Sequence, residues 1–160
     1  MANETISVSL VTPDTLLQNW QGHRRLTRKT IEAFPEDKLF QFSVGGMRTF
    51  GQMVLEMIGM AVPIVEGVST GTWEAFQHGK TETKSELLRL WDDQTILLDE
   101  KFPKIPPARF WVVDKAFGQW EMPGIVTIQY AIDNEIHHRG QGYVYLRALG
   151  IEPPHFWERS

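Results

Sequence analysis

The sequence predicts an all-α fold, specifically a four-helix bundle with a crossover connection. Apolar residues recur at spacings of three and four in four stretches of roughly 18 to 26 residues. Capping residues precede these stretches, and glycine or proline follows them. No repeat and no low-complexity tract interrupts the pattern. Four long helices of this kind are the usual components of a bundle.

The first helix is expected to begin at residues 12–14 and to end before Pro35. Thr12 can cap it, proline suits the first helical position, and the aspartate that follows complements the helix dipole. Its apolar face is Leu16, Trp20, His23, Thr27, Ile31 and Phe34. The second helix is expected to begin with the capping box of residues 49–52 and to run to about Gly67, with a kink at Pro63.

The third and fourth helices are expected further along the chain, after a loop over residues 68–81. The capping box of residues 83–86 opens the third helix, which continues to Phe102. Residues 103–122 hold three prolines and the β-rich run 110–113, which suggests an ordered crossover that can include a small hairpin before Gly118. The fourth helix is expected from Pro123 to Leu149, where Gly150 stops it.

Composition places the chain among globular proteins and excludes several classes of function. At 160 residues it is expected to form a single domain, residues 1–160. The net charge of −4, with scattered cations, argues against a nucleic-acid or membrane partner. No run is expected to reach the apolar length needed to span a bilayer, and the first residues lack the pattern of a signal peptide. Cysteine is absent, which excludes disulfides and thiolate chemistry, and the cytoplasm is the expected compartment.

Two unusual polar features stand out against the apolar faces. Asn134 and His138 are four residues apart in the last helix, so they share a face that is otherwise apolar or small. Glu56 is the only charged residue between Arg48 and Glu66 in the second helix. A buried carboxylate is normally paired, metal-bound or protonated. The ordinary alternatives are a solvent-facing Glu56 and an asparagine–histidine pair that only fixes the packing of the helix.

The neighbouring residues of the last helix have structural interpretations. His137 is expected to face outward, and His23 in the first helix to be a buried structural histidine. Arg139 lies off the face of Asn134 and His138, so it is expected to pair with a carboxylate on an adjacent helix or at a dimer contact. Gly140 is unfavourable inside a helix, which suggests close approach of a neighbouring helix or of a partner subunit.

The last helix resembles that of DinB-like (DinB/YfiT) proteins. The resemblance rests on residues 134–141 (Asn-Glu-Ile-His-His-Arg-Gly-Gln), 145–147 and 150–154, with further similarity at residues 47–52 and 72–73. It implies a four-helix bundle with crossover topology, commonly a homodimer. It also implies a divalent metal held by three histidines, one in the second helix and two, four residues apart, in the fourth. Characterised relatives include transferases and isomerases that use low-molecular-weight thiols.

This sequence departs from the family pattern at two of the three metal positions. His138 matches the last histidine, whereas Glu56 and Asn134 stand where the other two are expected. The predicted ligand set is therefore Glu56, Asn134 and His138, converging in one pocket. Because an amide oxygen is a weak ligand, a divalent metal (nickel, zinc, iron or manganese) is expected to bind weakly or not at all. Without metal, Glu56 could accept a hydrogen bond from His138.

Two functions remain open from the sequence, and they differ in class. One is a metal-assisted transferase or hydrolase, thiol-dependent in one form, that acts on an unknown small molecule through a degenerate metal site. The other is a non-catalytic, dimeric ligand-binding or interaction bundle that has lost the metal. A homodimer is expected in either case, because the chain has six tryptophans and nine phenylalanines and aromatic residues are enriched at interfaces.

Overall fold

A computed structural model describes residues 11–76 and 79–160. Four long helices form the bundle: α1 (Pro13–Ala33), α3 (Phe50–Thr70), α4 (Lys84–Lys101) and α5 (Gly124–Ala148). A short helix, α2 (Glu36–Leu39), follows α1, and the 3-10 turns η1 (Phe102–Lys104) and η2 (Pro107–Phe110) follow α4. A hairpin of β1 (Val113–Ala116) and β2 (Trp120–Pro123) leads directly into α5.

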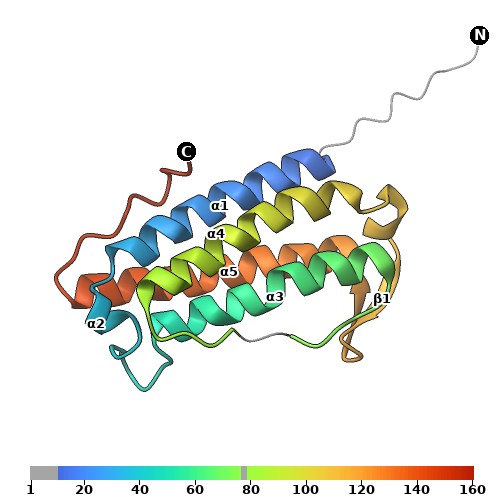
Figure 1. The fold of residues 1–160 in the computed structure, drawn as a ribbon. Coiled ribbons are helices and arrows are strands. Elements are labelled where there is room, and N and C mark those ends of the chain that lie inside the picture. The colour runs from blue at the N-terminus through green and yellow to red at the C-terminus, as the bar shows by residue number, and fades with distance from the viewer. Residues whose placement is uncertain (1–10, 77–78) are drawn as a thin grey trace, which may run out of the picture.

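In chain order, the four long helices α1, α3, α4 and α5 run up, down, down and up. Gln94 of α4 bonds Ile58 of α3, and Lys101 of α4 pairs with Glu66 of α3, so α3 and α4 are parallel neighbours. In Figure 1 the segment between α3 and α4 runs back along the length of the bundle, whereas α4 and α5 are joined at one end. The crossover is therefore the connection between α3 and α4, of which the structure describes residues 71–76 and 79–83. The expectation that residues 103–122 supply it was wrong, because that longer segment is folded into turns and a hairpin.

The helix starts follow the capping residues closely. Thr12 accepts a hydrogen bond from the Thr15 N–H, and Thr49 forms a reciprocal capping box with Gln52. Thr83 accepts from the Glu86 N–H at the start of α4. Pro63 lies inside α3, which continues past the expected end at Gly67 to Thr70; the predicted loop over 68–81 therefore begins too early. Gly71, at φ 78°, ends the helix in the left-handed conformation that glycine favours.

The core forms two apolar clusters with a polar layer between them. One cluster, at the hairpin end, includes Trp20, Ile64 and Phe102; the other, at the α2 end, includes Phe34, Phe50, Met53, Trp91 and Tyr145. Between them, the inward positions of α1, α4 and α5 carry polar side chains: His23, Arg24, Thr27, Thr30, Gln94, Glu135, His138 and Arg139. The candidate functional groups lie in this middle layer.

Helix α3 is long and apolar enough to cross a bilayer by length and composition alone. This corrects the expectation that no stretch reaches that length. In the bundle, however, 56% of the apolar stretch of α3 is buried, and the helix packs against both α4 and α5. Its apolar character is that of a central core helix, because both of its flanks are covered.

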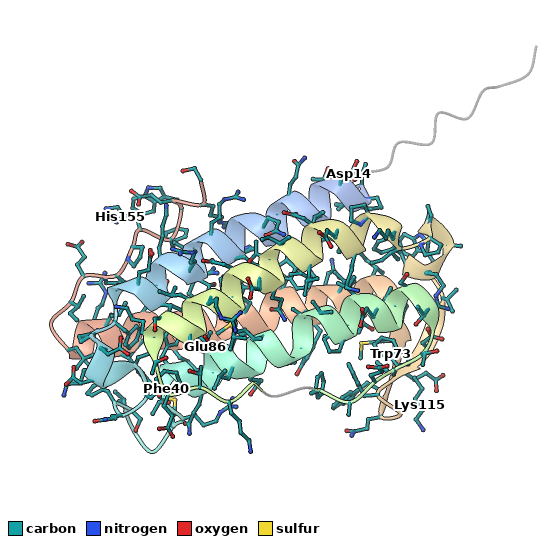
Figure 2. The ribbon with its side chains drawn as sticks, in the orientation of Figure 1. Asp14, Phe40, Trp73, Glu86, Lys115 and His155 are labelled. Carbon is teal, nitrogen blue, oxygen red and sulfur yellow. The ribbon has the colours of Figure 1, made fainter. Side chains whose placement is uncertain are left out.

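The hairpin and the α3–α4 segment close one end of the bundle. Strand β1 pairs with β2 in antiparallel register, from Val113 with Pro123 to Ala116 with Trp120. Of the predicted β-rich run at 110–113, Phe110 ends the 3-10 turn η2 and only Val113 lies in a strand, so the hairpin lies around Gly118 instead of before it. Figure 2 shows Trp73 and Lys115 at this same end, opposite Phe40.

Candidate functional site

The structure brings Glu56, Asn134 and His138 together, as the sequence predicted. Glu56 lies on α3, and Asn134 and His138 lie one turn apart on the antiparallel helix α5. Asn134 Nδ2 donates to Glu56 Oε1 at 3.2 Å, and His138 Nε2 lies 3.1 Å from the same oxygen. The cluster is mostly enclosed: the His138 side chain is 8% exposed and that of Glu56 is 23% exposed.

Two further residues complete the cluster, and the sequence reasoning did not identify either of them. Arg48 forms an ion pair with Glu56 through Oε2, the oxygen that Asn134 and His138 leave free. Gln141 Oε1 lies 2.7 Å from His138 Nδ1. Gln141 could have been found from its spacing, because three residues after His138 it shares the same helix face. For Arg48 the sequence offered only one signal, its position immediately before the capping box of α3.

The segment that carries Arg48 is fixed onto α5. Tyr145, about one turn beyond Gln141, donates its hydroxyl to the Arg48 carbonyl at 2.9 Å. Gln141 Nε2 also contacts the Met47 sulfur at 3.5 Å. Thr49 then caps α3. These contacts hold the guanidinium next to Glu56 although half of the Arg48 side chain is exposed.

Glu56 is an ionised carboxylate at neutral pH. Burial by itself raises the pKa of Glu56, but the hydrogen bonds from Arg48, Asn134 and His138 together outweigh it and lower the pKa below its usual value. A carboxylate that accepts several hydrogen bonds is stabilised in its charged form. The site therefore presents a fixed negative charge that Arg48 partly neutralises.

His138 is placed between two oxygen acceptors. Gln141 Oε1 faces Nδ1, and Glu56 Oε1 faces Nε2. A neutral imidazole carries one N–H and can satisfy only one of these oxygens, whereas an imidazolium satisfies both. The two contacts together fix the orientation of the ring, with Nε2 towards Glu56 and Nδ1 towards Gln141.

The donor set of this cluster does not fit a tightly held divalent metal. Asn134 turns its NH₂ group, which is not a ligand, towards Glu56, and the second Glu56 oxygen is engaged by a guanidinium. Across residues 11–76 and 79–160, no three His, Cys, Asp or Glu side chains form a group that could hold a metal ion. One imidazole and one carboxylate are fewer strong donors than metal centres usually have.

An apolar pocket adjoins the polar cluster, with Glu56 in its wall. The pocket has a volume of about 270 Å³. Met60 and Ile64 of α3 and Thr127 and Tyr130 of α5 form its sides. The crossover segment and the hairpin contribute the remaining residues: Phe76, Ala116, Phe117, Trp120 and Met122.

Phe117 is held over this pocket in an unusual backbone conformation. Its φ of 52° lies in the left-handed region, which costs a non-glycine residue roughly 1 kcal/mol. Its ring packs against Phe76 at 4.2 Å and Trp73 at 5.0 Å between ring centroids. Trp73 in turn packs on Gly67, where a side chain would collide with the indole. The aromatic contacts thus offset the strain and fix the wall of the pocket.

The opposite face of α5 carries a separate buried polar network. Arg139 is 6% exposed and donates to the His23 carbonyl at 3.2 Å, to Thr27 Oγ1 at 3.1 Å and to His23 Nδ1 at 3.0 Å. The prediction that Arg139 pairs with a carboxylate on an adjacent helix is therefore wrong. The carboxylate near Arg139 is Glu135, on the same helix, at 3.9 Å. His23 is buried and His137 is exposed, as predicted.

Glu135 is the most deeply buried carboxylate of the described chain, and the sequence reasoning missed it. It is 2% exposed and accepts hydrogen bonds from Trp20 Nε1 and Thr27 Oγ1. Burial raises its pKa, against the charges of Arg24 and Arg139. A signal was present in the sequence, because Glu135 shares the α5 face of Ala131 and Gly142.

Gly140 was explained from the sequence by the close approach of a neighbouring helix, and for the helices of this chain that explanation is wrong. A Cβ atom added at Gly140 would meet nothing within 4 Å, whereas one added at Gly142 would lie 2.5 Å from the Phe50 ring. Gly142 is therefore the glycine that lets α3 approach α5 closely. Gly140 faces open space because it lies on the side of α5 that no helix of the bundle covers.

The fold and the site define a class of protein: a four-helix bundle with a polar cluster between its α3 and α5 helices and an apolar pocket beside it. The DinB family model matches residues 1–160, so the chain belongs to the DinB family. It is 22% identical over 148 residues to the uncharacterized protein YjoA of Bacillus subtilis strain 168, covering 90% of this chain and 96% of YjoA.

Two solved structures of DinB-like proteins share this fold. The protein from Bacillus cereus ATCC 10987 superposes with a TM-score of 0.73 at 18% identity and covers 90% of this chain and 97% of its own. B. subtilis YjoA superposes with a TM-score of 0.73 at 20% identity and covers 91% of this chain and 99% of its own. At these identities the likeness establishes the fold and does not extend to an activity.

Proposed function

We propose that this DinB-family protein binds a small, largely apolar molecule in the pocket beside Glu56, and that Glu56 and His138 contact the polar group of that molecule. One observation carries the proposal: Glu56 belongs both to the polar cluster and to the pocket wall. A concave apolar site with a few convergent polar groups is the usual form of a small-molecule site.

The lining determines the chemistry of the ligand. Four aromatic rings and several aliphatic side chains favour a planar or aliphatic body. A carboxylate accepts about four hydrogen bonds, and Arg48, Asn134 and His138 already use three of these positions at Glu56. The ligand is therefore expected to carry one hydrogen-bond donor, such as a hydroxyl or amine, at the end that reaches Glu56.

The orientation of His138 supports a second function, a transferase or hydrolase. Gln141 fixes the imidazole so that Nε2 points towards Glu56. An oriented imidazole beside a carboxylate can transfer protons to and from a bound substrate. No step of this chemistry is assigned to a metal, because Arg48 and the Asn134 amide occupy the Glu56 oxygens that a metal would need.

Binding is tested by titrating 4-methylphenol, with toluene as the analogue that lacks the donor, and following tryptophan fluorescence and calorimetry. The cresol should bind the wild type and should bind Glu56→Gln at least about tenfold more weakly, a difference of 1.4 kcal/mol. Glu66→Gln is the matched control, because Glu66 is another α3 carboxylate and pairs with Lys101 at 2.6 Å, outside the pocket. Equal affinity of Glu56→Gln and wild type would contradict the polar contact.

A second pair of variants tests the location of the site. Met122→Trp should fill the pocket and abolish cresol binding, because Met122 is part of the wall. Val126→Trp adds the same ring at an exposed position of α5 outside that wall and should leave binding unchanged. Loss of binding in both variants, or in neither, would count against this pocket.

Catalysis is distinguished from binding by turnover. The protein, purified without a histidine tag, is analysed for metal and assayed with p-nitrophenyl acetate. The enzymatic alternative requires turnover above background that is lost in His138→Gln and retained in His137→Gln, an exposed neighbour. Stoichiometric metal that survives dialysis against a chelator would contradict the metal-free form of the site.

A further inference from the structure

We propose that a second cavity, between α1, α5 and the C-terminal segment, binds a small organic anion such as an aromatic carboxylate. The cavity has a volume of about 350 Å³, and its lining includes Arg139, Arg159, Gly140, Ile136 and Phe156. It lies on the α1 side of α5, whereas Glu56 and its pocket lie on the α3 side. Figure 1 shows the C-terminal segment returning beside α1, where it closes this region.

The C-terminal segment is docked on α1 by specific contacts. Arg25 Nε donates to the Arg159 carbonyl at 2.7 Å. A Cβ added at Gly22 would lie 3.3 Å from the Arg159 Cβ, which shows how closely the segment approaches α1. These contacts place the Arg159 guanidinium at the wall of the cavity.

The charges around the cavity are unbalanced in favour of an anion. Arg139 is buried, and the guanidinium of Arg159 repels it while Glu135 attracts it. Glu135 also interacts with a second buried cation, Arg24. Arg24 has further carboxylates nearby in Asp92 and Asp99. At the cavity itself, Glu135 lies 3.9 Å from Arg139, and Arg159 adds a second positive charge. Buried charges are normally paired, so an anion in the cavity would complete the pairing.

His23 cannot satisfy both of the arginines that face it. Its Nδ1 lies 3.0 Å from Arg139 Nη2, and its Nε2 lies 3.3 Å from Arg159 Nη1. Burial, and then these two cations, lower the pKa of His23 to about 4, so the ring is neutral and offers a single acceptor nitrogen. Arg159 Nη1 has one further, long contact to Asn19 Oδ1 at 3.4 Å. A carboxylate between the two guanidiniums would accept from both.

The rest of the wall leaves room for an apolar group. Gly140 lines the cavity, and the space where its side chain would project is empty to 4 Å. A glycine at this position lowers helix stability by about 1 kcal/mol relative to alanine, and packing within the chain does not require it. Ile136 and Phe156 supply apolar surface next to it, which favours an organic anion over an inorganic one.

The full-length protein is titrated with sodium benzoate, inorganic phosphate and chloride at constant ionic strength and pH 7.5, by thermal shift and calorimetry. Benzoate should stabilise the protein above the chloride control and more than phosphate does. Arg159→Gln should weaken benzoate binding at least about tenfold, or 1.4 kcal/mol. Arg147→Gln changes an exposed arginine of α5 outside the cavity and should leave benzoate binding unchanged.

A second variant tests the cavity without changing any charged residue. Gly140→Leu should fold, because its side chain enters open space, and should abolish benzoate binding by filling the cavity. Met122→Trp, which blocks the pocket beside Glu56, should leave the benzoate response intact and so separates this site from the proposed function. Any of three results would overturn the proposal: benzoate stabilises the protein no more than chloride does, benzoate and phosphate give equal responses, or Gly140→Leu binds benzoate as the wild type does.

Discussion

Glu56 Oε1 lies 3.1 Å from His138 Nε2, which links the centre of α3 to the centre of α5. Both residues come from helix faces that are otherwise apolar, and each has a second partner: Arg48 for Glu56 and Gln141 for His138. Glu56 of this pair also lines the apolar pocket, so changes to the pair should affect ligand binding, metal affinity and the acid stability of the fold.

Restoring the family's metal ligands should create a metal site. The double variant Glu56→His, Asn134→His would place three imidazoles where the hydrogen-bonded cluster now lies. Three neutral nitrogens suit nickel and zinc better than a carboxylate, an amide and an imidazole. We expect affinity for either ion at least about a hundredfold above wild type, about 2.7 kcal/mol, by calorimetry. No gain would mean that the helix geometry does not match that of a three-histidine site.

Glu56 should stabilise the fold at neutral pH and cease to do so in acid. Its pKa is lowered in the folded state, so its stabilisation is present above the usual value of 4.5 and is lost as the pH falls through the lower, folded value. Chemical denaturation should show Glu56→Gln less stable than wild type at pH 7, and the difference should shrink below pH 4.5. A difference independent of pH would exclude a contribution from the charge.

His23 should make the fold less stable at mildly acidic pH. Its pKa is about 4 in the folded state against 6.5 unfolded, so only the unfolded state gains a proton between these values. Stability should therefore fall from pH 6.5 to about pH 4, and His23→Asn should reduce that slope. His137→Asn changes an exposed histidine and serves as the control. Equal slopes in wild type and His23→Asn would contradict the assignment.

The two glycines of α5 should respond oppositely to alanine. Gly142→Ala should destabilise the fold by about 1 to 3 kcal/mol, because the added carbon collides with the Phe50 ring. Gly140→Ala should be neutral or stabilise by up to about 1 kcal/mol, because it adds helix propensity in open space. Thermal unfolding of the two variants side by side measures this; equal destabilisation would indicate that Gly140 is covered, as in a dimer contact.

We expect a homodimer, as the aromatic content suggested. Loop packing buries part of that content, since Trp73 and Phe76 contact Phe117, but Trp111 stays 74% exposed, Tyr130 54% and Trp120 47%. Light scattering should give a mass near twice 18.4 kDa. Trp111→Ser should weaken the dimer, and Trp157→Ser in the exposed C-terminal segment is the control. A monomer mass at micromolar concentration would contradict the prediction.

Local sequence determined the elements of this protein. Thr12, Thr49 and Thr83 fixed where three helices begin, because a side-chain cap depends on only a few neighbouring residues. The spacing of Asn134 and His138 and the isolated carboxylate of Glu56 marked these three residues as unusual, but residue types alone left their convergence open. The resemblance to DinB-like proteins pointed to the same residues, and the match over the whole chain confirms the family.

Only the tertiary structure decided how those elements combine. The crossover lies between α3 and α4 because Gln94 and Lys101 contact residues distant in sequence on α3, which no local pattern encodes. The same holds for Arg48, which reaches Glu56 across eight residues, and for Glu135, which is enclosed by side chains of α1. Gly140 and Gly142 look alike in the sequence, and only the position of Phe50 distinguishes them. Burial and charge pairing depend on the surroundings of a side chain, and those surroundings exist only once the helices have packed.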